Sequence, residues 1–162
     1  DSIEHGIFMD EVCCTEMKAA GTYLVPTLAA VNNILRHADQ GIPAYAVEKS
    51  QRVAERHRAS VKMYYDAGGR IAMGTDAGTP FNRHGENALE LEYMVDIGMS
   101  PLDALVSGTS TAANLLRESE RGRVESGCFA DLLVVNGDPC ETITMASRKE
   151  NHRLVVKNGV AI

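Results

Sequence analysis

The chain has 162 residues, of which 44% are hydrophobic and 23% charged, so it can form a globular domain with a real core. Its formal net charge of −6, without a cluster of Lys and Arg, argues against nucleic acid as a partner, and no apolar run is long enough to span a membrane. The four cysteines form no C-x-x-C pair and predict free thiols in a reducing, cytoplasmic compartment. Because the chain begins with Asp1 and not Met, it is expected to be a fragment or a processed chain. Any targeting segment is then expected upstream of Asp1.

The first half of the chain alternates between short apolar runs and amphipathic stretches, which predict buried strands and helices respectively. The expected elements are a strand at residues 2–5, a helix at 9–20, a strand at 22–28, a helix at 47–65 and a strand at 70–76. The residues that give the second helix its spacing are Val47, Ala54, Val61 and Tyr65. Residues 29–46 are ambiguous and fit a helical insertion broken at 41–43. Strands that alternate with helices predict a parallel sheet with right-handed crossovers.

The second half predicts further helices and then a small β unit. Helices are expected at residues 87–96, from 100 onward and at 109–116. Ser100 has the position of an N-cap, with Pro101 at the first helical position. The tail elements are a strand at 131–135 and a hairpin of 153–157 and 160–162 around Asn158-Gly159, the strongest two-residue hairpin signal. The sequence therefore predicts an α/β domain at residues 1–120 and a small antiparallel β domain at 121–162.

Two residues suited to metal binding close predicted strands. His5 closes the first strand and Asp76 the third, and a turn signal follows each. The carboxyl ends of parallel strands lie at one edge of a sheet, where α/β barrels place their active sites, so both side chains are expected to face one mouth. An imidazole can ligate a transition metal, and a carboxylate can both bind a metal and take a proton from water. Alone, each residue fits a turn or surface position as well or better, but together they favour a metal site.

Other polar residues near these strand ends are candidates for substrate contacts. His84 lies in the loop after the third strand and Thr27 at the end of the middle strand, so both are expected to bind substrate. A solvated loop histidine and a threonine that only packs are the competing interpretations. Three further histidines, in the insertion, on a charged helix and in a tail loop, are expected not to be ligands: His37, His57 and His152.

Five segments in chain order resemble one family. Residues 1–6 (DSIEHG) and 74–78 (GTDAG) resemble the sixth and eighth barrel strands of amidohydrolases related to imidazolonepropionase and the Xaa-Pro dipeptidases. Residues 100–113 resemble the helices that follow the eighth strand, 122–132 the return of the chain into the small β domain, and 156–159 its closing hairpin. Together the segments cover essentially the whole chain, which is similar to the C-terminal part of this branch.

The resemblance implies a fold and a set of site residues. The implied fold is α/β, the C-terminal portion of a (β/α)8 TIM-like barrel (strands 6 to 8 with their helices), joined to part of a composite β-sandwich domain. His5 matches a histidine that ligates metal, Asp76 matches an aspartate that is both metal ligand and general base, and His84 matches a substrate-contacting position only loosely. Family members use one or two divalent metal ions, usually zinc, to activate water for attack on an amide carbon. The remaining family ligands have no counterpart here and are expected upstream of Asp1.

These features favour a metal-dependent hydrolase of C–N bonds with Asp76 as its base, dipeptidase- or carboxypeptidase-like. The expected partner is a small-molecule or dipeptide substrate, and a homo-oligomer stays open. A ring-opening hydrolase of a cyclic amide and a non-catalytic, truncated module are the alternatives. A nucleotide-binding domain would need a glycine-rich phosphate loop, which the sequence lacks. The isolated chain is expected to bind metal poorly, to be inactive and to expose an apolar sheet edge.

Overall fold

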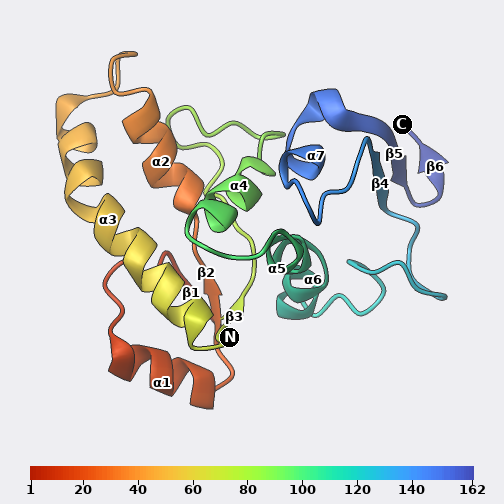
Figure 1. The fold of residues 1–162 in the computed structure, drawn as a ribbon, viewed down its shortest axis with the longest axis horizontal. Helices are drawn as coiled ribbons and strands as arrows, with labels where there is room; N and C mark the ends of the chain where they lie inside the picture. Colours follow the sequence, from red (N-terminus) through yellow and green to blue (C-terminus); the bar gives the residue numbers. More distant parts are fainter.

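Two three-stranded sheets form the framework of the computed structural model, which describes all of residues 1–162. The first sheet is parallel with the strand order β1-β2-β3, and the second is antiparallel with the order β4-β5-β6 (Figure 1). The strands are β1 (Ser2–Glu4), β2 (Tyr23–Val25), β3 (Arg70–Ile71), β4 (Leu132–Val135), β5 (His152–Lys157) and β6 (Val160–Ala161). The expected parallel pairing in the first half and the antiparallel tail are both present, whereas the domain boundary at residue 121 stays a prediction.

Seven helices and two short helical turns connect the strands. In Figure 1, α1 and α3 lie on the outer side of the parallel sheet, while α4, α5 and α6 lie between the two sheets. None of these helices combines the length and the apolar character of a membrane-spanning segment. The helices are α1 (Glu11–Ala19), α2 (Leu28–Arg36), α3 (Ala44–Asp66), α4 (Leu89–Asp96), α5 (Pro101–Val106), α6 (Ala112–Leu115) and α7 (Thr144–Ser147). The turns are a π-helical turn, Ser107–Thr111, and a 3-10 turn, Lys149–Asn151.

Side-chain caps fix the start of two helices. Asp10 precedes α1, and its carboxylate accepts a hydrogen bond from the Cys13 backbone N–H at 2.8 Å. Ser100 precedes α5, and its hydroxyl accepts from the Asp103 backbone N–H at 3.0 Å, with Pro101 in the first turn. Each cap satisfies an N–H group that a helix start leaves without an intrahelical partner. The predicted helix start at Ser100 is confirmed.

The third strand is shorter than the sequence predicted. β3 ends at Ile71, whereas the predicted strand ran on into the GTDAG segment. The Met73 N–H leaves the sheet and donates to the Ser107 carbonyl at 3.0 Å. Gly74 then packs closely against β2: a Cβ at that position would lie only 2.3 Å from Val25 Cγ1, so only glycine fits there. The chain therefore reaches the GTDAG aspartate as an extended loop packed on the sheet.

One helix prediction is confirmed and another needs correction. Residues 29–46, expected to form a helical insertion broken at 41–43, form most of α2 and the first residues of α3, separated by a loop that ends at Pro43. The separate helix expected at 109–116 is instead continuous with α5 through the π-helical turn. Gly108 lies inside this continuous helix and does not end it. A Cβ at Gly108 would lie 3.2 Å from Met73 Sδ, so the glycine allows Met73 to pack closely against the helix.

The main hydrophobic core lies between the parallel sheet and the helices beside it. Leu24 of β2, Leu28 of α2, and Val61 and Tyr64 of α3 have no exposed surface. Burying a large apolar side chain stabilises the fold by about 1.5–3 kcal/mol. The Tyr64 hydroxyl donates to the Thr22 carbonyl at 2.7 Å, so its polar tip is satisfied. The other members of the core are Met9, Cys14, Met17, Ala29, Ile71, Leu91, Tyr93, Met94, Ile97, Met99, Ala104, Ile143 and Ala146.

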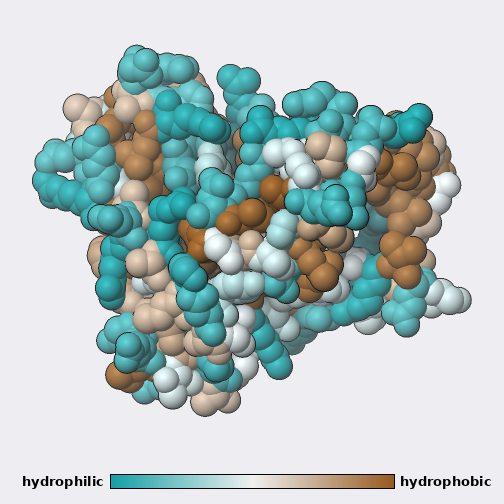
Figure 2. Space-filling view, viewed as in Figure 1, coloured by the Kyte–Doolittle hydropathy of each residue, from teal (hydrophilic) through white to brown (hydrophobic).

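Apolar side chains are exposed on both sheets. β1, at the edge of the parallel sheet, is exposed along its length, including Ile3, as expected. In the antiparallel sheet Asn158 and Gly159, with φ of 51° and 80°, join β5 to β6, which confirms the predicted hairpin. Hydrophobic residues gather on the surface near β5 and β6 (Figure 2). The exposed apolar residues of this sheet and its end are Leu133, Val134, Leu154, Val155, Val160 and Ile162.

Candidate active site

The parallel sheet ends in three residues with a left-handed backbone. His5 follows β1, Thr27 follows β2 and Asp76 follows β3, with φ of 65°, 52° and 56°. Residues other than glycine rarely adopt this conformation, and for a β-branched threonine it is a genuine outlier. Such strain costs on the order of 1–3 kcal/mol per residue and persists only where the surrounding structure enforces it. Half of the six non-glycine residues with positive φ therefore lie at this edge of the sheet, which marks it as a candidate functional site.

The same three side chains converge. His5 Nδ1 lies 2.6 Å from the Thr27 hydroxyl oxygen, and His5 Nε2 lies 3.9 Å from Asp76 Oδ2. The second distance is too long for a hydrogen bond. When Nδ1–H donates to Thr27, the ring orientation is set and the Nε2 lone pair faces Asp76. The side chains of His5 and Asp76 are 46% and 50% exposed, so both are accessible to a ligand.

A buried histidine holds two of these strand ends. His57 of α3 is 1% exposed, and its Nε2 lies 2.9 Å from the His5 carbonyl oxygen and 2.8 Å from the Pro26 carbonyl oxygen. Carbonyl oxygens only accept hydrogen bonds, so Nε2 carries the hydrogen and donates to both. The Pro26 carbonyl belongs to the peptide bond that leads into Thr27. One imidazole therefore fixes the backbone on both sides of the contact between His5 and Thr27.

Burial also determines the charge state of His57. Burial lowers the pKa of the His57 imidazole below its ordinary value of 6.5, and the hydrogen bonds to the two carbonyls oppose this shift. The Nδ1 atom is buried without a hydrogen-bond partner. A neutral ring protonated on Nε2 satisfies both carbonyls and leaves Nδ1 as an unpaired acceptor.

Replacing His57 by Phe keeps a ring of similar size but removes the donor. Leaving buried carbonyls without a partner costs about 1–3 kcal/mol, so the free energy of unfolding is expected to fall by about 2 kcal/mol. Urea denaturation followed by circular dichroism measures the change. The control is His84→Phe at an exposed position, which is expected to shift the free energy of unfolding by less than about 0.5 kcal/mol. An unchanged stability of His57→Phe would show that the strand ends do not depend on this donor.

The helix that follows Thr27 is capped by a buried carboxyl group. Glu90 of α4 has no exposed surface, and its two carboxyl oxygens accept hydrogen bonds from the Leu28 and Ala29 backbone N–H groups at 2.7 and 2.6 Å. These N–H groups open α2 and have no partner within the helix. Thr27 provides no side-chain cap, and its hydroxyl contacts His5 instead. Glu90 thus takes over the capping role and anchors the segment that carries Thr27.

A cavity of about 350 Å³ opens over the converging side chains. His5, Thr27, Asp76 and His57 line it, together with residues of α2 and α3. A pocket of this size can enclose a small ligand. The cavity therefore brings a ligand-sized space to the pair formed by His5 and Asp76.

The other histidines lie outside the lining of this cavity. His84 is exposed in the loop after β3, and its Nε2 lies 3.8 Å from the point where a Cβ on Gly78 would sit. Its substrate contact stays a prediction. His37 stacks on Phe81 with ring centroids 4.5 Å apart, and the His152 ring lies 2.8 Å from a backbone carbonyl oxygen.

The donor atoms at the strand ends fit part of a metal site. No group of three or more His, Cys, Asp and Glu side chains is placed to hold a metal ion. Zinc bonds imidazole nitrogen and carboxylate oxygen at about 2.0–2.2 Å, so two ligands of one tetrahedral zinc ion lie about 3.4 Å apart. His5 Nε2 and Asp76 Oδ2 are 3.9 Å apart, so a small side-chain movement is needed for both atoms to bind one ion. A catalytic zinc normally takes three protein ligands, and this pair can supply two of them.

Sequence reasoning missed two residues that shape the site. His57 lies four and seven positions before Val61 and Tyr64, so helical spacing places all three on one face of α3, and this signal could have identified a buried histidine. Glu90 left no such signal. Its partners are the backbone N–H groups of Leu28 and Ala29, about sixty positions away, and backbone groups do not depend on residue type.

Sequence and structure comparisons relate the chain to known hydrolases. The profile of the amidohydrolase family matches residues 1–162. Ochratoxinase of Aspergillus niger is 29% identical over 161 residues, which is 98% of this chain and 33% of ochratoxinase. Imidazolonepropionase of Pyrobaculum arsenaticum is 31% identical over 90 residues, which is 55% of this chain and 22% of that enzyme.

A solved structure agrees with this relation. A crystal structure of a Xaa-Pro dipeptidase with methionine bound in its active site is similar to this chain with a TM-score of 0.88 and 38% sequence identity. The similarity covers 100% of this chain and 39% of the dipeptidase chain. The chain therefore spans less than half the length of each of these three proteins.

Proposed function

This chain belongs to the amidohydrolase family, and from that premise we propose that the whole protein hydrolyses C–N amide bonds with a divalent metal ion. The expected substrates are dipeptides or acylated amino acids. The observation that carries the proposal is the approach of His5 Nε2 to Asp76 Oδ2, 3.9 Å apart at the cavity. Both residues follow the carboxyl ends of parallel strands, where α/β barrels hold their catalytic groups.

The fold supports this placement. It is α/β and close to that of the TIM-barrel amidohydrolases. We propose that β1, β2 and β3 are strands 6, 7 and 8 of such a barrel and that residues 121–162 belong to a second, β domain. The strand order β1-β2-β3 with parallel neighbours supports the assignment, because consecutive strands of a barrel lie side by side.

Each residue of the site has a role in this proposal. His5 and Asp76 would hold the metal ion, which when bound supplies a Lewis acid and activates water. Asp76 takes a proton from the attacking water and passes it to the leaving nitrogen. Thr27 orients the His5 ring and contacts the substrate from the cavity lining. His84 contacts the substrate from the loop that follows Asp76.

The metal content of the whole protein tests the ligand roles. His5→Ala removes a nitrogen donor, so the zinc retained per protein after dialysis is expected to fall at least about tenfold. Inductively coupled plasma mass spectrometry measures the metal. His152→Ala is the matched control, because the His152 ring contacts a backbone carbonyl outside the cavity, and its metal content is expected to be unchanged. Full zinc retention in His5→Ala would remove His5 from the ligand set.

An activity assay tests the reaction itself. The zinc-loaded whole protein is incubated with N-acyl amino acids, dipeptides and a cyclic amide, and release of the free amine is measured. Turnover of the linear amides, lost with a chelator and restored by zinc, is the expected result. The 31% identity to imidazolonepropionase favours ring opening of a cyclic amide as the second candidate function. Metal binding without turnover of any amide would contradict both and favour a non-catalytic module.

A further inference from the structure

The cavity beside the pair formed by His5 and Asp76 has an apolar wall. Val31 and Ile34 of α2 and Val53 of α3 line it. Pockets that bind small molecules commonly combine such a wall with a few polar groups that fix the orientation of the ligand. An apolar side chain of a substrate would leave water on entering this cavity, which favours binding.

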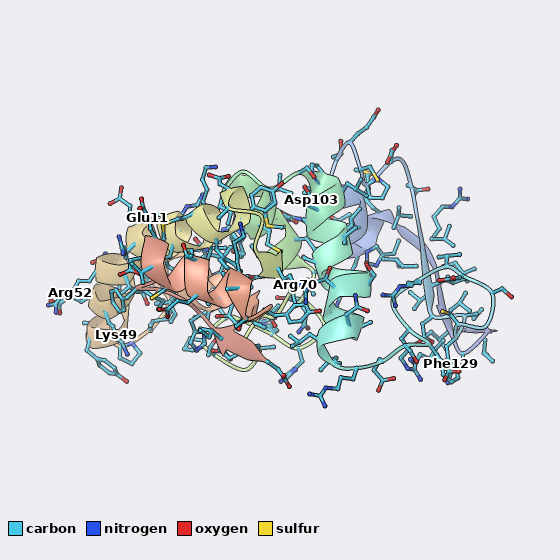
Figure 3. All side chains as sticks on the ribbon, turned by 90° about the horizontal axis from the view of Figure 1, so that it is seen from below. Glu11, Lys49, Arg52, Arg70, Asp103 and Phe129 are labelled. Carbon is cyan, nitrogen blue, oxygen red and sulfur yellow. The ribbon has the colours of Figure 1, made fainter.

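One basic side chain joins this lining. Lys49 of α3 is exposed and is the single Lys or Arg among the residues that line the cavity. The carboxylate next to it in the chain, Glu48, is bound by Arg52, and Lys49 itself makes no ion pair. Figure 3 shows Lys49 near Arg52, at the end of the molecule far from Phe129. The Lys49 ammonium group therefore has no protein carboxylate as its partner.

We propose that Lys49 binds the free carboxylate of an N-acylated hydrophobic amino acid and so determines substrate specificity. This inference rests on the proposed hydrolysis at His5 and Asp76. For that reaction the amide group must reach Asp76, so the substrate carboxylate has to be held elsewhere. An ammonium group on α3, a different element of the same cavity, offers the opposite charge for it. The apolar wall accepts the side chain of the amino acid.

A simpler role for Lys49 makes a different prediction. A lysine at an apolar cavity can act as a cover, with its methylene groups packed on the wall and its charge in water. Lys49→Met keeps an unbranched apolar stem and removes the charge. If Lys49 only packs on the apolar wall, this change should leave activity intact. If the Lys49 ammonium group binds the substrate carboxylate, the change should weaken substrate binding.

Paired substrates distinguish the two roles in the whole protein. N-acetyl-leucine carries the carboxylate and N-acetyl-leucinamide does not, and release of acetate is measured for both. Lys49→Met is expected to lower kcat/KM for N-acetyl-leucine about tenfold or more, mainly through KM, because a charged hydrogen bond is lost. The same change is expected to leave kcat/KM for N-acetyl-leucinamide within about twofold, and Lys49→Arg to retain most activity on both.

Lys62→Met is the matched control, since it makes the same change at an exposed position of α3 that does not line the cavity, and both substrates are expected to react as with the wild type. Equal losses on both substrates for Lys49→Met, or no loss on either, would overturn the anchor. Calorimetry measures the Kd for N-acetyl-leucine independently of the proposed hydrolysis. Lys49→Met is expected to bind N-acetyl-leucine about tenfold more weakly than the wild type does, whether or not N-acetyl-leucine is hydrolysed. Weaker binding without any hydrolysis would overturn the proposed reaction alone, and equal Kd values would overturn the anchor.

Discussion

Asp76→Asn is expected to lower kcat for amide hydrolysis by the whole protein about 100- to 10,000-fold, the usual contribution of a general base. Asparagine keeps the size of the side chain and one oxygen, but its amide group cannot take the proton of the attacking water. The backbone at Asp76 has a φ of 56°, which asparagine also tolerates, so the fold is expected to survive. Steady-state kinetics on an N-acyl amino acid measure the effect.

The control for this variant is Asp96→Asn, the same chemical change at an exposed position at the end of α4, outside the cavity. Its kcat is expected to match that of the wild type. Zinc content is measured in parallel, because a loss of rate that only follows a loss of metal says nothing about the base. An Asp76→Asn protein with full zinc and more than about a tenth of the wild-type rate would exclude Asp76 as the base.

Stability is expected to depend on pH through Glu90. Burial raises the pKa of the Glu90 carboxyl from 4.5 to about 8, although the hydrogen bonds from the Leu28 and Ala29 N–H groups favour the ionised form. The folded protein therefore holds this proton more tightly than the unfolded chain does. The stability that Glu90 contributes is fully present below pH 4.5 and is lost as the pH rises toward 8. The loss over this range is on the order of 5 kcal/mol.

Glu90→Gln is expected to remove this pH dependence. The glutamine oxygen can accept one of the two N–H groups of α2, but its NH2 group cannot accept the other, so the free energy of unfolding at low pH falls by about 1–3 kcal/mol. Because glutamine does not titrate, the further loss that the wild type shows between about pH 5 and pH 8 is expected to disappear. Urea denaturation of both proteins at these two pH values measures the difference.

Glu86→Gln is the control for this experiment. Glu86 lies shortly before α4, is partly exposed, and its carboxylate is not a helix cap. Both its stability and its pH dependence are expected to match the wild type. If Glu90→Gln loses stability between the two pH values as steeply as the wild type, some other group is responsible for the titration.

Short-range signals in the sequence predicted several elements correctly. The pair Ser100-Pro101 begins α5, and Asn158-Gly159 forms the tail hairpin. Both depend on local chemistry: a hydroxyl that caps its own helix, and two residues that accept positive φ. The parallel pairing of β1, β2 and β3 also followed from the alternation of strands and helices along the chain.

Hydrophobic spacing predicted α3 as a helix but not most of the face that it buries. Of Val47, Ala54, Val61 and Tyr65, which gave that spacing, only Val61 is buried and the others are partly buried. The helix instead buries Ser50, His57, Ser60, Val61 and Tyr64. The reason is visible in the contacts: the Ser60 hydroxyl lies 3.0 and 3.1 Å from the Ile7 and Met9 carbonyl oxygens, and His57 donates to two more carbonyls. A helix face that packs on the backbone carbonyls of the loops after β1 and β2 needs hydrogen-bond donors, so apolar residues do not reveal it.

The sequence alone determined the fold class and the pairing of His5 with Asp76. Each follows a strand of the parallel sheet, and parallel topology brings the carboxyl ends of strands to one edge. Only the tertiary structure decided which side chains hold that edge in its strained backbone conformation. His57 and Glu90 do so by binding carbonyl and N–H groups of distant segments. Almost every residue has a backbone N–H and a carbonyl group. The sequence therefore does not show which of these groups lack a backbone partner in the fold and are hydrogen-bonded by a side chain instead.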